Sequence, residues 1–302
     1  MNYPTYRLSA YTTGLLAEAG MSPLDVESLA LRAVTEDIGD GVDVTTMATV
    51  PVDQRGVLVL AARAEGVVAG LPVAAAVFDV VCGEDREIDT LVDDGEQIGA
   101  GQAIMRVRAR THDLLRAERP ALNFLGHLSG IATLTARWVA AIAGTSAVIR
   151  DTRKTTPGMR ELEKYAVRVG GGENHRMSLA DAALVKDNHV LAAGGVAEAF
   201  AAVRAVDPDI DVEVEVDDLD QLDEALDAGA DLILVDNFPL EDMIEAARRS
   251  QGRARLEASG GLNLERAPAV AATGVDYLAV GALTHSAPVL DIGADLSVSD
   301  PE

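Results

Sequence analysis

The hydrophobic pattern of the second half of the chain alternates between two kinds of segment. Short runs rich in Val, Ile and Leu have the composition of strands that are buried on both faces: SAVIRDTR, AALVKDNH, VEVEVDD, LILVDNF, RLEASGG and YLAVGAL. Amphipathic stretches with helical spacing, such as LDQLDEALDAGA and LEDMIEAARRS, separate most of these runs. A strand followed by a helix, repeated in this way, predicts parallel βαβ units and favours a complete or partial α/β barrel over an open sheet.

The pattern over residues 57–110 is different and predicts a first domain dominated by strands. Apolar and polar residues alternate in IMRVRAR, and glycines punctuate the turns. Gly99-Ala100-Gly101 resembles part of a dinucleotide fingerprint, but the third glycine is missing, so we interpret it as a turn between strands. The run GVVAGLPVAAAVF is too short for a membrane span and contains Pro72, which favours a buried strand and helix.

Residues 112–144 have apolar positions at helical spacing and predict one long helix, or two helices joined near Pro120. This segment separates the two predicted domains. We place the first domain at residues 1–121, with the C-terminal tail 289–302 packed on it, and the barrel domain at residues 122–288.

Composition and charge limit the classes of partner. The chain has 302 residues, of which 48% are hydrophobic, a composition typical of a globular protein. Its formal net charge of -24 at pH 7 disfavours binding to nucleic acid or to an anionic membrane. Any anion site must therefore be local. The N-terminal residues show no signal-peptide pattern, and the single cysteine, Cys82, excludes an intrachain disulfide and a cysteine-based zinc site, so we expect a cytoplasmic protein.

Charged or glycine-rich residues follow nearly every predicted strand of the barrel, where active sites of parallel α/β barrels lie. Basic residues lie at the ends of the first two predicted strands and in the loop between these strands. They could bind a compact anion with more than one carboxylate: Arg153, Lys154, His175, Arg176 and Lys186. Glu215 and Asp236 are hard oxygen ligands that suit Mg²⁺ or ribose hydroxyls. Backbone N–H groups that could bind a phosphate belong to Ser259, Gly260, Gly261, Gly281 and Ala282.

Each of these residues also has a purely structural interpretation. A lysine at a strand end, such as Lys186, is more often solvated or paired, and Asp236 could simply cap a helix. His175 could be a hydrogen-bonded structural histidine. Glu213 and Glu215 share one face of their strand, and we favour Glu215 because it is nearer the C-terminal end. The three histidines that lack ligand-like spacing are interpreted as structural: His112, His127 and His285.

Several motifs together resemble those of the quinolinate phosphoribosyltransferase family. They are ERPALNFLGHLSGIAT, DTRKTTPGMRELEKYAVRVGGGENHR, LADAALVKDNH, VEVEVDDLDQ, LILVDNF, EASGGL and VGALTHSAPVLDIG. The resemblance implies an N-terminal α/β open sandwich beside an incomplete α/β barrel. It also implies transfer of phosphoribosyl from phosphoribosyl pyrophosphate (PRPP) to quinolinate, with Mg²⁺, giving nicotinate mononucleotide, pyrophosphate and carbon dioxide in de novo NAD synthesis.

The resemblance assigns roles to individual positions. Quinolinate would be bound by Arg119, Arg153, Lys154, His175, Arg176 and Lys186, and among these Lys154 and Lys186 would be catalytic. Glu215 and Asp236 would be catalytic too, serving ribose and Mg²⁺, and the glycine-bearing loops would line the 5′-phosphate. Arg119 would reach the neighbouring site of a homodimer or higher homo-oligomer, although Pro120 departs from the family's usual threonine and leaves the helix geometry there open.

Two other functions remain open at this point. A related phosphoribosyltransferase could use another acceptor, such as nicotinate, or act as a homologue associated with molybdenum transport. A non-catalytic anion-binding protein would need only the cations and the phosphate loops, so the presence of Glu215 and Asp236 argues mildly against it.

Overall fold

The computed structural model describes residues 5–298 and divides into two compact units. The first unit contains the chain up to Leu134, Glu161–Gly170 and the chain from Ala287 onward, and the second contains Thr135–Arg160 and Gly171–Ser286. Residues 1–4 of the predicted first domain and residues 299–302 of the predicted tail lie outside the described residues.

An antiparallel sheet of four strands, in the order β12-β1-β5-β3, forms the framework of the first unit. Its strands are β1 (Arg55–Ala62), β3 (Glu87–Thr90), β5 (Ala103–Arg110) and β12 (Ile292–Val298), and a separate pair is formed by β2 (Gly66–Val67) and β4 (Gln97–Ile98). The C-terminal strand β12 pairs with β1 from Gly56 opposite Val298 to Ala62 opposite Ile292. The first unit thus contains strands from both ends of the chain.

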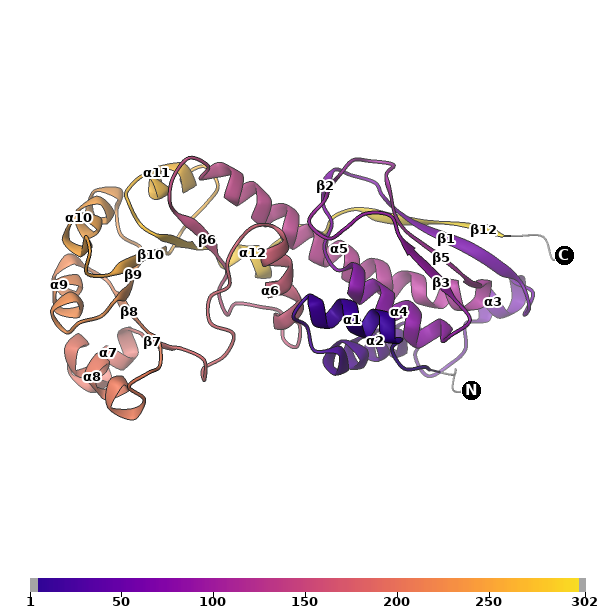
Figure 1. The fold of residues 1–302 in the computed structure, drawn as a ribbon, viewed down its shortest axis with the longest axis horizontal. Coiled ribbons are helices and arrows are strands. Elements are labelled where there is room, and N and C mark those ends of the chain that lie inside the picture. Colours follow the sequence, from indigo (N-terminus) through magenta and orange to yellow (C-terminus); the bar gives the residue numbers. More distant parts are fainter. Residues whose placement is uncertain (1–4, 299–302) are drawn as a thin grey trace. The chain divides into compact units, whose positions relative to one another are not determined.

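Helices also belong to this unit: α1 (Ala10–Glu18), α2 (Pro23–Ile38), α3 (Val44–Thr49) and α4 (Leu71–Cys82). Helix α4 is buried on every side, which explains why its sequence has no polar face, and it packs against β5 while α1 and α2 pack on it (Figure 1). Together with β2 it confirms the predicted buried strand and helix. The first three helices were not predicted, so the unit is less strand-dominated than its sequence suggests.

One continuous helix, α5 (Thr111–Ala141), contains Pro120 and confirms the first of the two alternatives that the sequence left open. It begins in the first unit and ends in the second. The predicted turn at Gly99-Ala100-Gly101 is confirmed, because it connects β4 to β5 and Gly101 has a positive φ of 85°.

Helix α6 (Arg160–Val169) belongs, after its first residue, to the first unit, although both neighbouring segments belong to the second. Hydrogen bonds of several of its side chains hold α6 in the first unit. Glu161 accepts the N–H of Ser22 at 2.9 Å and Glu163 lies 2.9 Å from His127, while Tyr165 donates to Asp94 at 2.6 Å and Arg168 donates to the carbonyl of Ala19 at 3.0 Å. The helix is therefore fixed at several points along its length.

The second unit is built on a parallel sheet of six strands, in the order β6-β11-β10-β9-β8-β7. The strands are β6 (Val148–Arg150), β7 (Ala183–Val185), β8 (Val212–Val216), β9 (Leu232–Asp236), β10 (Arg255–Ser259) and β11 (Tyr277–Ala279). Each lies in one of the six apolar runs, so the predicted repeat is confirmed. Because β6 and β7 stand at opposite ends of this order, the barrel is incomplete, as the family resemblance implies.

Helices lie outside this curved sheet (Figure 1). They are α7 (Asp187–Ala193), α8 (Val196–Val206), α9 (Leu219–Asp227), α10 (Leu240–Ser250), α11 (Ala267–Ala271) and α12 (Ala282–His285). Asp218 caps α9 by accepting the N–H groups of Asp220 and Gln221 at 3.0 and 2.8 Å. Within residues 5–298 no single helix is both long and apolar enough to cross a membrane, and the one pair that qualifies jointly, α7 with α8, is bent by 89°.

Close packing of α5 against the C-terminal segment generates a stability prediction. A Cβ atom at Gly130 would lie 2.1 Å from the carbonyl oxygen of Pro288, so Gly130→Ala should destabilise the protein by roughly 1–3 kcal/mol. The matched control is Gly14→Ala in α1, where nothing lies within 4 Å and alanine should stabilise the helix by up to about 1 kcal/mol. Urea unfolding measures both, and equal midpoints for the two variants would contradict this packing.

Candidate active site

The predicted site residues of the second unit all lie at or beyond the carboxyl ends of the strands, or in the loop that precedes β7. Arg153 and Lys154 follow β6, and His175 and Arg176 lie in a segment that runs beside it through a bridge between Arg150 and Glu173. The others lie at the ends of the remaining strands: Lys186, Glu215, Asp236, Ser259, Gly260, Gly261, Gly281 and Ala282. This edge of the sheet is where the sequence predicts the site.

Arg153 and Arg176 are two cations whose charges act on each other. Burial, and then the charge of Arg153, lower the pKa of Arg176 below its usual range, and the charges of Glu213 and Asp181 oppose this shift only in part. Both Nε atoms are buried without a hydrogen-bond partner among the described residues. Within residues 5–298, moreover, neither these arginines nor Lys154 forms an ion pair with a carboxylate. Such an arrangement is costly unless an anion joins it.

Arg160 holds the loops that carry these two arginines. Its guanidinium donates to the carbonyl of Arg153 at 3.4 Å, to the hydroxyl of Thr155 at 3.0 Å and to the carbonyl of Met177 at 3.0 Å. Arg176 in turn donates to the carbonyl of Ala182 at 2.9 Å. The cationic loops are therefore fixed mainly through their backbones, which leaves much of the guanidinium surface available.

His175 lies above a buried group of acids. Its Nε2 atom is 2.6 Å from Glu213 and 3.6 Å from Glu257, and Glu257 accepts from Arg150 at 2.8 Å. The side chains of Glu213 and Glu257 are 3% and 0% exposed. Asp151, which is fully buried, accepts the backbone N–H of His175 at 2.9 Å.

Burial, followed by the negative charge of Glu213, raises the pKa of Glu257 to about 7. Arg150 opposes this shift through its charge and its hydrogen bond but does not cancel it. One of the two neighbouring carboxyl groups therefore retains a proton well above the usual range of a glutamic acid.

Lys186 and Glu215 form an ion pair at 3.1 Å. The lysine side chain is 48% exposed, whereas that of Glu215 is 15% exposed, so the pair is screened by solvent and can be exchanged at little cost. Lys186 is also the N-cap residue of α7, and its backbone N–H donates to Nδ1 of His189 at 3.0 Å.

The loops after β9 and β10 contact each other closely. Asp236 accepts from the side chain of Asn237 at 2.6 Å, and Asn237 donates its N–H to the carbonyl of Ser259 at 2.9 Å. Gly260 has a φ of 86°, and a Cβ atom there would lie 2.2 Å from the Asn237 side chain. Only glycine fits at this position, which leaves backbone N–H groups unobstructed near the carboxylate of Asp236.

The loop after β11 adjoins the cationic loop. A Cβ atom at Gly281 would lie 3.1 Å from the side chain of Lys154, and Thr284 donates to the carbonyl of Lys154 at 2.9 Å. Gly281 immediately precedes the short helix α12, which begins at Ala282. The predicted cation Lys154 and the predicted phosphate loop are thus neighbours.

Two sets of side chains could be considered for a metal ion. His175, Glu213 and Glu257 offer donor atoms within 4.8 Å of one another, but the 2.6 Å separation of Nε2 and the Glu213 carboxylate is a hydrogen bond, whereas two ligands of one ion lie about 3 Å apart. Glu215 and Asp236 lie on adjacent strands near the rim of the sheet. Two carboxylates supplemented by phosphate oxygens and water are a usual donor set for Mg²⁺, so this second set fits that ion.

Arg119 belongs to the first unit, on α5, and its side chain is 59% exposed. The three histidines interpreted as structural all have local partners. His112 lies 3.0 Å from the carbonyl of Val50, His127 pairs with Glu163, and His285 lies 2.6 Å from the hydroxyl of Ser286.

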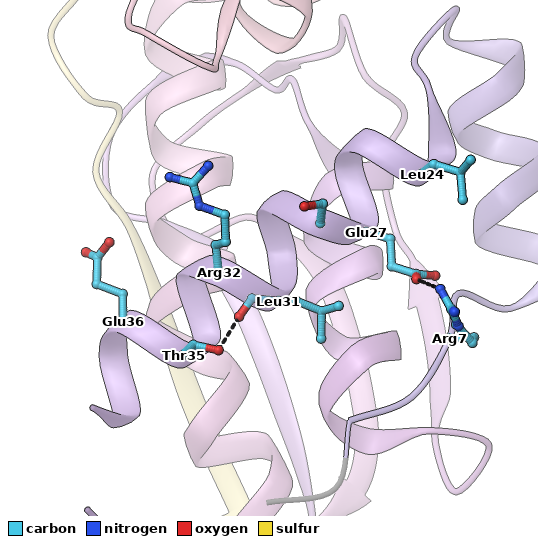
Figure 2. Close-up of a pocket in the computed structure, with 8 residues that line it drawn as sticks. Arg7, Leu24, Glu27, Leu31, Arg32, Thr35 and Glu36 are labelled. Atoms are coloured by element: carbon cyan, nitrogen blue, oxygen red, sulfur yellow. Dashed lines mark hydrogen bonds and ion pairs between the residues drawn. The ribbon is translucent and has the colours of Figure 1, made fainter. Parts of the chain in front are cut away.

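A cavity of about 610 Å³ in the first unit lies along α2 and contains none of the predicted site residues (Figure 2). Its lining residues are Arg7, Leu24, Glu27, Ser28, Leu31, Arg32, Thr35 and Glu36. Arg7 pairs with Glu27, and Thr35 donates to the carbonyl of Leu31 at 2.7 Å, so its polar groups serve the helix and the N-terminal segment.

Comparison with known proteins identifies the family. Models of the quinolinate phosphoribosyl transferase N-terminal and C-terminal domains match residues 43–129 and 131–295. The chain belongs to the quinolinate phosphoribosyltransferase family. The nicotinate-nucleotide pyrophosphorylase (carboxylating) of Mycobacterium leprae is 53% identical over 269 residues, which are 88% of this chain and 95% of the relative.

Solved structures give the same result for this quinolinate phosphoribosyltransferase family member. NadC from Streptococcus pyogenes has a TM-score of 0.89 at 39% identity, covering 93% of this chain and 99% of that one. Human nicotinic acid phosphoribosyltransferase, at 12% identity and a TM-score of 0.58, shares the fold alone. The family resemblance and the fold class predicted from the motifs are confirmed.

Sequence reasoning missed Glu257 and Arg160, and it preferred Glu215 to Glu213. Glu257 stands two positions before Ser259 in RLEASGG, so strand periodicity places both on one face, and a charged residue within an apolar run is itself a signal. Both glutamates of β8 have partners here: Glu213 is deeper and contacts His175, and Glu215 is nearer the rim and contacts Lys186. No sequence pattern distinguishes Arg160 from a surface arginine.

The raised pKa of Glu257 predicts a pH dependence of stability. In the unfolded chain this group loses its proton near pH 4.5, but in the folded protein near pH 7, so its contribution is complete below pH 4.5 and is lost as pH rises through 7. Between pH 5 and pH 8 the wild type should lose about 2 kcal/mol relative to Glu257→Gln, in which position 257 does not titrate. Urea unfolding at both pH values measures this difference, and an identical pH dependence in the two proteins would contradict it.

Proposed function

We propose that this protein transfers phosphoribosyl from PRPP to quinolinate with loss of carbon dioxide, giving nicotinate mononucleotide and pyrophosphate for NAD synthesis. The observation that carries the proposal is the pair of cations Arg153 and Arg176, which lie near each other and form no ion pair with a carboxylate among the described residues. Their buried Nε atoms also lack a hydrogen-bond partner among those residues. Lys186, whose ion pair with Glu215 is exposed to solvent, could add a further positive charge. Quinolinate is a planar dicarboxylate, and guanidinium groups bind carboxylates in a planar, bidentate manner.

PRPP would occupy the neighbouring loops. Ser259 is paired with Asp236 across the sheet, and a Cβ at Gly260 would collide with the side chain of Asn237, so the loop that begins at Ser259 requires glycine there. Gly281 and Ala282 would supply further backbone contacts near Lys154. We assign the 5′-phosphate to these glycines, because backbone N–H groups in such loops favour a compact anion.

Mg²⁺ would be held by Glu215 and Asp236 together with pyrophosphate oxygens, and would neutralise charge on the leaving group. The two carboxylates would also favour the positive charge that develops on the ribosyl carbon as its bond to pyrophosphate breaks. Glu215 must release Lys186 for this task. That exchange costs little because the lysine is half-exposed, and the freed lysine can then bind a carboxylate of the acceptor.

The chemistry of the acceptor requires no further protein nucleophile. The pyridine nitrogen attacks the ribosyl carbon, pyrophosphate departs with the bonding electron pair, and the ring becomes cationic. Loss of carbon dioxide from the carbon next to this nitrogen leaves an electron pair on that carbon, where the positive nitrogen stabilises it. Uptake of a proton from solvent at the same carbon then gives nicotinate mononucleotide. The protein contributes by positioning and by charge, since the acceptor's carboxylates must be held while the nitrogen reaches the ribose.

The test is an assay with quinolinate, PRPP and Mg²⁺ in which nicotinate mononucleotide and carbon dioxide are followed together, with nicotinate as a parallel acceptor. We expect equal amounts of both products from quinolinate. Turnover on nicotinate alone would overturn the choice of acceptor, and tight binding of quinolinate without turnover would identify a binding protein.

Variants of the cations connect this activity to the site. Arg153→Ala and Lys186→Ala should each weaken quinolinate binding by on the order of 2–5 kcal/mol while the protein remains folded. The control is Arg248→Ala, which removes a 70% exposed arginine on α10 and should leave kcat/KM unchanged. Near-wild-type KM and kcat in both site variants would contradict the assignment.

We also propose a homodimer in which Arg119 completes the neighbouring subunit's site, because the only ion pair that this exposed arginine forms with the described residues is a 4.0 Å contact with Glu118. Arg119→Ala and Lys186→Ala should each be nearly inactive alone. Co-expression should restore up to about a quarter of wild-type activity, since half of randomly formed dimers then contain one intact site. A mixture with no activity beyond the sum of the two variants would exclude shared sites.

A cytoplasmic location stays a prediction. It is supported by the single cysteine, Cys82, which is buried and whose pKa burial raises to about 12, so it is poorly suited to disulfide exchange.

A further inference from the structure

The hydrogen bonds of His175 define its protonation state. Its Nδ1 atom accepts the backbone N–H of Arg176 at 2.7 Å, so this nitrogen carries a lone pair and no hydrogen. The ring proton then lies on Nε2, which donates to Glu213 at 2.6 Å. This arrangement requires a neutral imidazole, because in an imidazolium the N–H at Nδ1 would point at the backbone N–H of Arg176.

The surroundings of the ring would also repel an anionic ligand. Glu213 on β8 and Glu257 on β10 lie next to Nε2, and the charged groups that balance them are Arg150 on β6 and Arg176 in the loop itself. The His175 side chain is 11% exposed. A substrate carboxylate approaching Nε2 would meet two buried acids, and at Nδ1 it would meet a lone pair.

The contact at Nδ1 instead acts on the arginine that follows. Asp151 holds the backbone N–H of His175, and His175 holds the backbone N–H of Arg176, so two successive backbone groups are fixed by side chains. The Arg176 guanidinium donates a hydrogen bond to the carbonyl of Ala182 and is close enough to Arg153 for the two charges to interact. Backbone placement, and not charge, is what His175 contributes to this pair.

We propose that His175 is a positioning residue: its Nδ1 atom, which accepts the backbone N–H of Arg176 in the neutral Nε2–H form, sets the backbone of Arg176 so that Arg176 and Arg153 together bind an acceptor carboxylate. This inference rests on the proposed function for the identity of the acceptor. It differs from the expectation that His175 is one of the substrate-binding cations.

Two substitutions separate placement from charge. In His175→Asn the side-chain oxygen is attached at the same branch point as Nδ1 and can accept the N–H of Arg176, whereas His175→Lys supplies a positive charge but no acceptor. We expect KM for quinolinate to rise less than threefold in His175→Asn and more than tenfold in His175→Lys, with kcat at saturation within threefold in both. Equal losses, or a smaller loss in His175→Lys, would overturn the proposal.

A second measurement needs no turnover. The chain has five histidines, and ¹⁵N-histidine spectra of the ligand-free protein, with the His175 signals assigned by their loss in His175→Asn, report the tautomer directly. We expect a protonated Nε2 and an unprotonated Nδ1 at pH 7. An imidazolium or an Nδ1–H tautomer would overturn the inference. Because the spectra are recorded without substrate, failure of the proposed reaction in the enzyme assay would be distinguishable from failure of this assignment.

Discussion

The repulsion between Arg153 and Arg176 is the constraint on which the rest of the site depends. Two guanidinium groups in a partly buried place repel each other more strongly than in water, because the surrounding dielectric is lower. Glu213 and Asp181 relieve this repulsion in part through their charges, without forming an ion pair with either arginine among the described residues. The loops themselves are fixed through backbone carbonyl and N–H groups, with Arg160 and Asp151 as the partners.

Charge in the second unit is ordered by depth along the strands. On β8, Glu213 lies below Glu215, and on β10, Glu257 lies below Ser259, as the two-residue period of a strand requires. Glu213 and Glu257 therefore form a lower layer that is balanced by Arg150 on β6, while Arg153, Lys154 and Arg176 lie on loops above. Glu215 and Asp236 lie at the rim between them. A local group of cations is thus compatible with a net charge of -24, because it depends on a few loops and not on the whole surface.

Much of this arrangement could be predicted from the sequence. Buried parallel strands are recognisable as short apolar runs, and their ends fix where polar residues converge, so the edge of the sheet carrying Lys186, Glu215 and Asp236 was predictable. Helices α1 and α2 were not, because they pack on α4, whose own residues are buried on all sides and show no period. Helix α3 has six residues, too few for a helical period to be recognised. Arg160 could not be found either, since its role consists of contacts with backbone atoms. The behaviour of His175 depends on a hydrogen bond to the next residue's backbone, which no spacing of residue types encodes.

The position of α6 in the chain links the folding of the two units. Its two flanking loops carry Arg153 on one side and His175 with Arg176 on the other, yet the helix itself is anchored in the first unit through Glu161, Tyr165 and Arg168. The second unit cannot be cut out of the chain as one continuous piece without losing those anchors. Unfolding of α6 together with the first unit would release the ends of both cationic loops at once.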